Sequence, residues 1–147
     1  MHPKVHNGGV DDHELARRCA EVLYRGDVAS QHLGITISDV SRGRATATMR
    51  VVDTMVNGHG IAHGGYVVLL ADTAFAFACN TYNARTVAQN LDVDFLAPVH
   101  AGDELVAIAV ERFRRGRSGI YDVTVRRGEE VVAEFRGRSR VAGGAIL

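Results

Sequence analysis

The chain has 147 residues, of which 46% are hydrophobic and 23% are charged. This length predicts one domain with a buried core, and the composition is that of an ordinary globular protein. The formal net charge of +0 argues against a general nucleic-acid binder, whose domain would be basic. No apolar signal sequence opens the chain, so a reducing cytoplasm is the expected compartment. We expect the two cysteines, Cys19 and Cys79, to be reduced core residues.

The first elements along the chain are a tail and a helix. Residues 1–10 (MHPKVHNGGV) are polar and rich in glycine, which predicts a flexible N-terminal tail. Residues 11–147 form the single predicted domain. This domain opens with a surface helix, because Asp11 suits the positive end of a helix dipole and Gly26 suits a helix end. The apolar face of this helix is Leu15, Cys19, Val22 and Leu23.

Strand-like patterns flank the middle of the chain. The pattern begins at Gln31 and predicts two strands, over residues 33–37 and 45–51, around a turn at residues 41–43. Four more strands are predicted after the middle, over residues 86–96, 105–110, 120–125 and 131–135. The first of these alternates apolar and acidic residues, as half-buried strands do. The second is continuously apolar, which predicts cover on both faces. Arg127-Gly128-Glu129 between the last two is a hairpin signal.

The stretch between the two groups of strands is Asn57 to Asn80, NGHGIAHGGYVVLLADTAFAFACN. It opens with a Gly/His loop and then becomes apolar, since only Asp72 and Thr73 are polar among the 14 residues 66–79. This run is too short to cross a bilayer, which needs ~20 residues. Because it is apolar on every side, it predicts a helix buried in a core. One antiparallel sheet around one long helix, an α+β fold, fits this order of elements.

Asp72 is the one charge of the predicted central helix. An isolated buried carboxylate costs several kcal/mol unless it is paired or hydrogen-bonded. The Gly64 and Gly65 amides would lie in the first turn, where free N–H groups and the helix dipole suit a developing oxyanion. Asp72 lies eight residues beyond Gly64, ~12 Å along a helix, whereas hydrogen-bond reach is ~3 Å. If both act on one substrate, Asp72 must come from a second, antiparallel copy of the helix.

A metal site is the alternative interpretation of the Gly/His loop. His59 and His63 are four residues apart, which on a helix would place both on one face. Gly58 and Gly60 disfavour a helix there, and the distance argument removes Asp72 of the same chain as a third ligand. We therefore expect no metal and no cofactor.

Four stretches of this sequence resemble the hotdog-fold acyl-CoA thioesterases of the phenylacetate-degradation (PaaI) type. They are residues 57–80, DVDFLAP at 92–98, AGDEL at 101–105 and FRGRS at 135–139. The resemblance implies a hotdog fold, a six-stranded antiparallel sheet wrapped around one long central helix. It also implies hydrolysis of aryl- or acyl-CoA thioesters without metal or cofactor, by a homodimer with shared active sites that pairs into a homotetramer.

The resemblance further implies catalytic roles for four residues. The Gly64 N–H would polarise the thioester carbonyl, and His63 and Asn57 of the same subunit would position the thioester or the attacking water. Asp72 of the partner subunit would be a general base on water, or a nucleophile through an anhydride, and spacing does not choose between these. Each residue also has a structural alternative: a hydrogen-bonded carboxylate for Asp72, satisfied backbone groups for His63 and a stabilised turn for Asn57.

The implied coenzyme A contacts are Asn90, Phe95, Arg114, Arg115, Gly116, Arg117, Ser118 and Gly119. Three arginines and two glycines in the last six suit an anion site, because guanidinium groups and backbone amides bind phosphate. The alternative is a solvated hairpin end. Tyr66 is a candidate for the acyl pocket by its position near the helix start, whereas we expect most of Phe75, Phe77 and Tyr82 to be core residues.

We therefore expect a thioesterase for phenylacetyl-CoA, hydroxyphenylacetyl-CoA or a related medium-sized acyl group. Two other functions stay open. One is a hydratase or dehydratase of the same fold that acts on an acyl thioester. The other is a non-catalytic acyl-CoA sensor, against which the N-terminal helix argues because no helix-turn-helix partner accompanies it.

Overall fold

The computed structural model describes residues 8–147, with side chains from Asp11 onward. The elements are α1 (Gly8–Gly26), α2 (Val28–His32), β1 (Thr36–Ser41), β2 (Arg44–Arg50), a 3-10 turn (Asp53–Met55), α3 (Gly64–Cys79), β3 (Thr86–Phe95), β4 (Glu104–Arg115), β5 (Ser118–Arg127) and β6 (Glu130–Val141). Helix α1 begins at Gly8, before the predicted start at Asp11. Residues 1–7 of the predicted tail lie outside the described residues.

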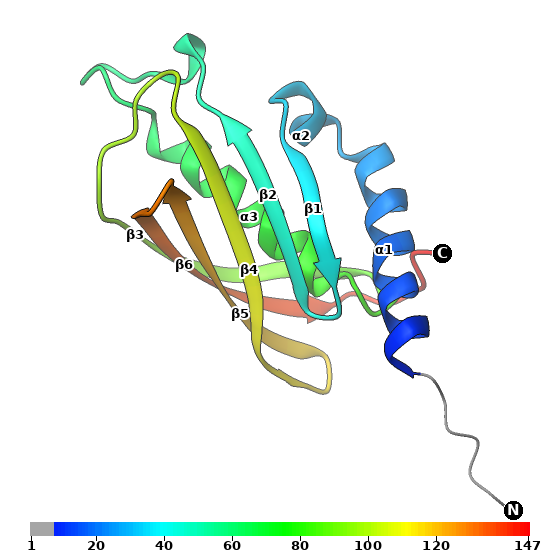
Figure 1. Ribbon diagram of the computed structural model, residues 1–147. Coiled ribbons are helices and arrows are strands. Elements are labelled where there is room, and N and C mark those ends of the chain that lie inside the picture. The colour runs from blue at the N-terminus through cyan, green and yellow to red at the C-terminus, as the bar shows by residue number, and fades with distance from the viewer. Residues whose placement is uncertain (1–7) are drawn as a thin grey trace, which may run out of the picture.

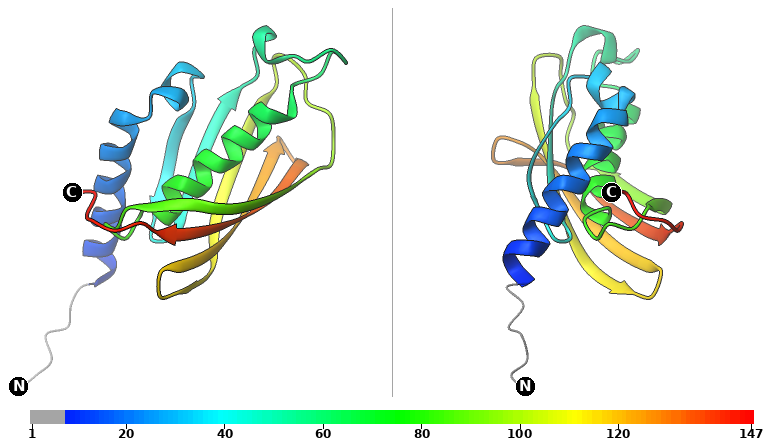
Figure 2. Two further views of the ribbon diagram at one scale, coloured as in Figure 1. Left: turned by 180° about the vertical axis from the view of Figure 1, so that it is seen from behind. Right: turned by 90° about the vertical axis from the view of Figure 1, so that its right-hand side faces the viewer.

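The six strands form one antiparallel sheet in the order β1-β2-β4-β5-β6-β3. Helix α3 runs along one face of this sheet, which curves around it (Figures 1 and 2). Leu70, Ala74 and Phe75 of α3 are fully buried in the interface. The predicted hotdog architecture, a six-stranded antiparallel sheet around one central helix, is confirmed.

Asn80 ends α3 and starts the path to β3. Its Nδ2 donates to the carbonyl oxygens of Ala76 (2.8 Å) and Thr86 (2.9 Å), and its Oδ1 accepts from the Thr86 N–H (2.9 Å). A side chain that satisfies both the last turn of a helix and the first residue of a strand stops the helix there. One buried amide side chain therefore joins the end of α3 to the start of β3.

The prediction of strand from Gln31 is wrong. Residues Val28–His32 form α2, because Asp27 caps it by accepting the Ser30 N–H at Oδ1 (3.0 Å). Gly34 then adopts φ +69°, which turns the chain before β1 begins at Thr36. Asp, Ser and Gly in this order carry cap and turn signals that outweigh the apolar pattern.

The two sheet edges differ in their cover. Helix α1 lies beside β1 and buries Ala16, Cys19 and Ala20 (Figure 1). Strand β3 pairs only with β6 within residues 8–147, and its Leu91 and Phe95 side chains are 38% and 55% exposed. The strand predicted to be half-buried is therefore largely exposed in a single chain.

Strand β4 alternates in burial, contrary to the prediction of cover on both faces. Leu105, Ala107 and Ala109 are fully buried, whereas Val106 and Ile108 are half-buried. The reason is that α3 covers only one face of the sheet. Both cysteines are buried and unpaired, as predicted. Within residues 8–147, no helix is both long and apolar enough to span a membrane.

Candidate active site

The N-terminus of α3 is capped by His63. This residue has φ −59° and ψ 131°, and its Nδ1 accepts the Gly65 N–H at 2.9 Å. Because Nδ1 accepts, the proton of the imidazole lies on Nε2, which is left as a donor. Of the two amides predicted for an oxyanion, Gly65 is therefore occupied by the cap. Within residues 8–147 the Gly64 N–H has no acceptor.

A pocket of about 510 Å³ lies beside Gly64. Three of the predicted site residues line it: Asn57, Gly64 and Phe95. The Phe95 ring lies against the helix start, since a Cβ on Gly64 would be 2.9 Å from the Phe95 Cζ. Glycine here lets a ring approach the backbone closely. The structure therefore joins the proposed oxyanion donor to an apolar pocket.

Asn57 closes the loop that leads to α3. Its Oδ1 accepts the N–H groups of His59 (2.9 Å) and Ile61 (3.3 Å), and its own N–H donates to the Ile61 carbonyl (2.8 Å). Gly60 completes the turn at φ +78°. The Oδ1 atom is therefore engaged in the turn, as the structural alternative for Asn57 requires. Only the Nδ2 amide group, with its two N–H donors, is left for a molecule in the pocket.

We expect Asn57→Asp to separate these two roles. Aspartate keeps the Oδ1 acceptor, so the turn and the melting temperature should stay close to those of wild type. The variant loses the Nδ2 donor, and we expect kcat/KM to fall by about tenfold if that donor contacts substrate, as a lost hydrogen bond does. Asn57→Ala, which removes both, is the comparison in thermal melts and thiol-release assays. Full activity in Asn57→Asp would leave Asn57 a turn residue only.

Asp72 lies on the side of α3 that its own sheet leaves uncovered. The residues of this uncovered stripe recur at helical spacing: Gly65, Val68, Leu69, Asp72 and Ala76. Asp72 Oδ1 is buried and is the one such side-chain oxygen or nitrogen without a hydrogen-bond partner among residues 11–147. Burial raises the pKa of Asp72 above that of an ordinary carboxyl. The side chain as a whole is half-buried, and within residues 11–147 its buried Oδ1 lacks the hydrogen-bond partner that burial of an oxygen requires.

Gly64 and Asp72 belong to the same helix and do not meet. Their separation of eight residues corresponds to ~12 Å along α3. The four residues predicted to be catalytic therefore divide into two groups in one chain. Asn57, His63 and Gly64 lie together at the helix start, and Asp72 lies in the middle of the helix.

The residues predicted to bind coenzyme A also lie in separate parts of the structure. Asn90 and Phe95 lie on β3 at an odd separation in regular register, so their side chains point to opposite faces of the sheet. The segment Arg114–Gly119 is a tight hairpin between β4 and β5, with Gly116 at φ +59°. It lies beside Cys79 at the C-terminus of α3, and Cys79 is ~22 Å along the helix from Gly64.

The three arginines of this hairpin differ in their contacts. Arg114 stacks on the Tyr82 ring, with 3.6 Å between its Cζ and the ring centroid, and the Tyr82 hydroxyl donates to Glu111 (2.8 Å). Arg115 and Arg117 are exposed and have no carboxylate partner among residues 11–147. The hairpin can therefore bind an anion through Arg115 and Arg117.

The aromatic residues considered for the acyl pocket lie in the core or at the two ends of α3. Phe75 and Phe77 are buried in the core, as expected. Tyr82 is tied to Glu111 at the far end of α3 and does not line the pocket. Tyr66 is half-buried and meets the His63 ring edge-on, with 6.4 Å between the centroids. Among residues 8–147, no three His, Cys, Asp or Glu side chains are placed to hold a metal ion.

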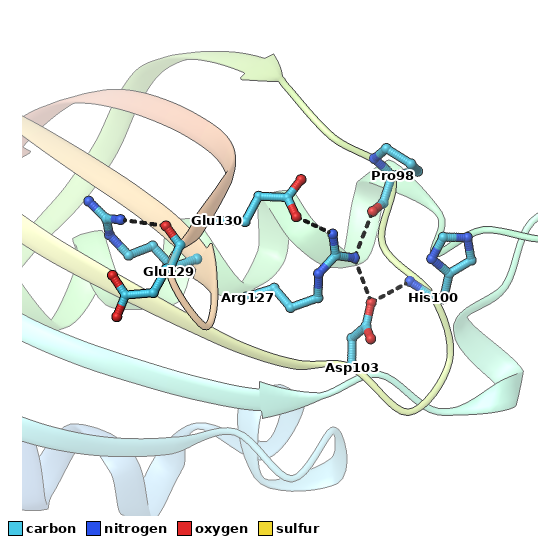
Figure 3. Close-up of polar contacts among 7 residues, drawn as sticks. Pro98, His100, Asp103, Arg127, Glu129 and Glu130 are labelled. Carbon is cyan, nitrogen blue, oxygen red and sulfur yellow. Dashed lines mark hydrogen bonds and ion pairs between the residues drawn. The ribbon is translucent and has the colours of Figure 1, made fainter.

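One wall of the pocket carries no signal of its role in the sequence. It is the loop between β3 and β4, whose Leu96, Pro98 and Val99 line the pocket. Arg127 and Asp103 hold this loop in place (Figure 3). Pro98 and Gly102 signal a turn, but no local pattern reports which distant strand the turn faces.

Comparisons with known proteins agree with this architecture. Residues 59–134 match the family model described as the thioesterase superfamily. The acyl-coenzyme A thioesterase PaaI of Escherichia coli (strain K12) is 43% identical over 128 residues, which are 86% of this chain and 91% of that protein. The structure of the E. coli PaaI protein from the phenylacetic acid degradation operon superposes with a TM-score of 0.88 at 41% identity, covering 90% of this chain and 96% of that one.

A mutant structure of phenylacetic acid degradation protein PaaI from Thermus thermophilus superposes with a TM-score of 0.74 at 34% identity. It covers 76% of this chain and 96% of that one. The shared fold, the matched family model and the glycine-rich helix start beside a pocket all support the same family assignment. The chain belongs to the thioesterase superfamily, as a hotdog-fold thioester hydrolase of the PaaI type.

Proposed function

We propose that this chain is a cytoplasmic acyl-CoA thioesterase. Its substrates are aryl-acyl thioesters such as phenylacetyl-CoA or hydroxyphenylacetyl-CoA, which it hydrolyses to the free acid and CoA. The observation that carries the proposal is the half-buried carboxylate of Asp72 on the uncovered stripe of α3, whose buried Oδ1 has no hydrogen-bond partner among residues 11–147. The relatives named PaaI support the reaction and the substrate class.

The chemistry assigns one role to each group. The thioester carbonyl accepts the Gly64 N–H at the positive end of α3, where negative charge on the oxygen is stabilised as the tetrahedral intermediate forms. The ionised carboxylate of Asp72 of the partner subunit takes a proton from water as the water oxygen attacks the carbonyl carbon. Collapse of the intermediate breaks the C–S bond, and the CoA sulfur takes up the proton. Direct attack by the carboxylate, with later hydrolysis of the anhydride, uses the same groups.

A second copy of the chain completes this site. If two α3 helices pack antiparallel through their uncovered stripes, a midpoint near Val68 places Gly64 of one chain opposite Asp72 of the partner subunit. Val68, Leu69 and Ala76 supply the apolar contact for such a helix pair. The exposed edge strand β3, with its apolar Leu91 and Phe95, supports the same pairing, because free strand edges pair with another strand. We propose that these dimers pair into a homotetramer.

An antiparallel helix pair would also bring the acyl pocket of one chain close to the phosphate-binding hairpin of the partner subunit. The hairpin at Arg115 and Arg117 lies near the C-terminus of α3, so the partner's hairpin would lie on the side of Gly64. The acyl group then occupies the pocket beside Phe95, whose apolar wall suits an aromatic ring. The phosphates of CoA reach the two free guanidinium groups.

We expect the double variant Arg115→Gln, Arg117→Gln to raise KM for phenylacetyl-CoA by about tenfold, with kcat nearly unchanged, because lost phosphate contacts weaken ground-state and transition-state binding alike. Phenylacetyl-N-acetylcysteamine has no phosphates and is the matched substrate. Its kcat/KM should be the same for wild type and variant. Equal KM values for phenylacetyl-CoA in both proteins would show that this hairpin is solvated and does not bind the phosphates of CoA.

Thiol release followed with a thiol-reactive dye tests the function itself. The panel contains phenylacetyl-CoA, hydroxyphenylacetyl-CoA, benzoyl-CoA, and short and long straight-chain acyl-CoAs. We expect turnover to be fastest with the two arylacetyl members. A change in enoyl absorbance without thiol release would replace the proposal with a hydratase or dehydratase. Tight binding of acyl-CoA without turnover would replace it with a sensor.

A further inference from the structure

Arg127 is the centre of a polar cluster with Pro98, Asp103 and Glu130 (Figure 3). Its Nη1 donates to the Pro98 carbonyl (2.9 Å) and to Asp103 Oδ2 (2.8 Å). Its Nη2 donates to Glu130 Oε2 (2.7 Å). Asp103 Oδ2 also accepts the His100 N–H (2.9 Å). One guanidinium thus joins the β3–β4 loop to the hairpin between β5 and β6.

The loop that Arg127 holds is bonded in turn to the segment before α3. The Val99 carbonyl accepts the Ala62 N–H (2.7 Å), and the His63 N–H donates to the Met55 carbonyl (2.7 Å). Pro98, bound by Arg127, is the neighbour of Val99, and Ala62 lies two residues before Gly64. A short chain of backbone contacts therefore links the guanidinium to the N-terminus of α3.

Backbone hydrogen bonds fix both ends of the β3–β4 loop. The Leu96 N–H donates to the Val132 carbonyl (2.8 Å), and the Gly102 N–H donates to the Val51 carbonyl (2.7 Å). Between these two anchors, Arg127 supplies the side-chain contact to the loop carbonyl at Pro98. Val99 is 4% exposed, so a shift of this carbonyl would disturb a packed wall of the pocket.

The geometry suits arginine and distinguishes Arg127 from its neighbours. A planar fork with several donors reaches a carbonyl and two carboxylates at once, which the single ammonium of lysine does not do. Arg127 is therefore not free to bind a phosphate, unlike Arg115 and Arg117. Arg126, the adjacent residue, is exposed, and among residues 11–147 its side chain donates only within its own turn, to the Glu129 carbonyl (3.1 Å).

We propose that Arg127 is a positioning residue for the active site. Paired with Asp103, it holds the Pro98–Val99 backbone, and through the Val99–Ala62 hydrogen bond it sets the position of the Gly64 N–H and of the pocket wall. The catalytic part of this proposal rests on the proposed thioesterase function. The structural part, the coupling of Arg127 to the start of α3, does not.

The test compares Arg127→Met with Arg126→Met, two adjacent residues with the same substitution. We expect Arg127→Met to lower kcat for phenylacetyl-CoA by about 10- to 100-fold, because a donor misplaced by ~1 Å loses that much rate. KM should change by less than about threefold, since the donor acts mainly in the transition state. Arg127→Lys keeps the charge and should be intermediate, and Arg126→Met should stay within about twofold of wild type.

Amide hydrogen exchange at residues 62–65 gives a readout that needs no turnover. We expect the hydrogen-bonded amides of Ala62, His63 and Gly65 to exchange faster in Arg127→Met and not in Arg126→Met, at a temperature where melting curves show both variants folded. Unchanged exchange and unchanged kcat in Arg127→Met, with only a lower melting temperature, would make Arg127 an ordinary surface ion pair. If wild type hydrolyses no thioester, the proposed function fails, whereas the exchange comparison still decides the coupling.

Discussion

Replacing Asp72 with Asn is expected to lower kcat by about 10²- to 10⁴-fold, which is the contribution of a positioned general base. The amide has the shape of the carboxylate but cannot take a proton from water or attack a carbonyl. Asp72 contributes no hydrogen bond at Oδ1 within the described chain, so the fold should persist. Thiol release, thermal melts and acyl-CoA binding by calorimetry measure the three quantities on one sample. Near-normal turnover would remove Asp72 from the mechanism.

The pH dependence of the wild-type protein also follows from the burial of Asp72. Burial raises the pKa of Asp72, so activity that needs the ionised carboxylate should fall as the pH drops through that raised value. The folded protein binds this proton more tightly than the unfolded chain, whose carboxyl has a pKa of ~3.9. Wild-type stability should therefore decrease relative to Asp72→Asn as the pH rises from ~3.9 through the folded pKa. Parallel stability curves for the two proteins across this range would contradict the shift.

Gly64→Pro is expected to lower kcat by about 10²- to 10³-fold, the usual cost of one lost oxyanion donor. Gly64 is the first residue of α3, where proline is favoured because that N–H has no acceptor in the helix. His63, at ψ 131°, already has the extended conformation that a residue before proline adopts. The variant therefore removes the amide donor while preserving the helix.

Gly64→Ala is the matched control. It keeps the N–H but adds the Cβ that meets the Phe95 ring at 2.9 Å, and so measures the steric part alone. The ring belongs to a side chain that is 55% exposed and can move aside. We expect Gly64→Ala to retain most of the activity that Gly64→Pro loses. Equal losses in the two variants would assign the effect to crowding of Phe95 and would refute the oxyanion role.

Mixing the Asp72→Asn and Gly64→Pro variants tests whether the active site is shared between subunits. In a heterodimer of Asp72→Asn with Gly64→Pro, one site combines the intact Gly64 of the first chain with the intact Asp72 of the partner subunit. The other site carries both defects. Random exchange of subunits should then restore about one quarter of wild-type activity, since half of the dimers are mixed and each has one intact site. No restoration after exchange would place both groups within one chain.

Local patterns were enough for the central part of this protein. The apolar run of residues 66–79 predicts a buried helix, and α3 spans Gly64–Cys79. The spacing between Gly64 and Asp72 alone separates the two groups along that helix. The turn at Arg127-Gly128-Glu129 was likewise readable, with Gly128 at φ +58°. These features depend on neighbours in the sequence, because helix periodicity and turn chemistry act over a few residues.

The tertiary structure alone decided what surrounds the helix. The Phe95 ring on Gly64 and the guanidinium of Arg127 on Pro98 are contacts between residues about 30 positions apart, which no local pattern encodes. The sheet also separates residues that the sequence grouped, since Asn90 and Phe95 share a strand but face opposite sides. Sequence therefore named the groups that are proposed to carry the chemistry. Strand register and loop packing decided which of them meet, because the backbone of one element is positioned only by the elements that pack against it.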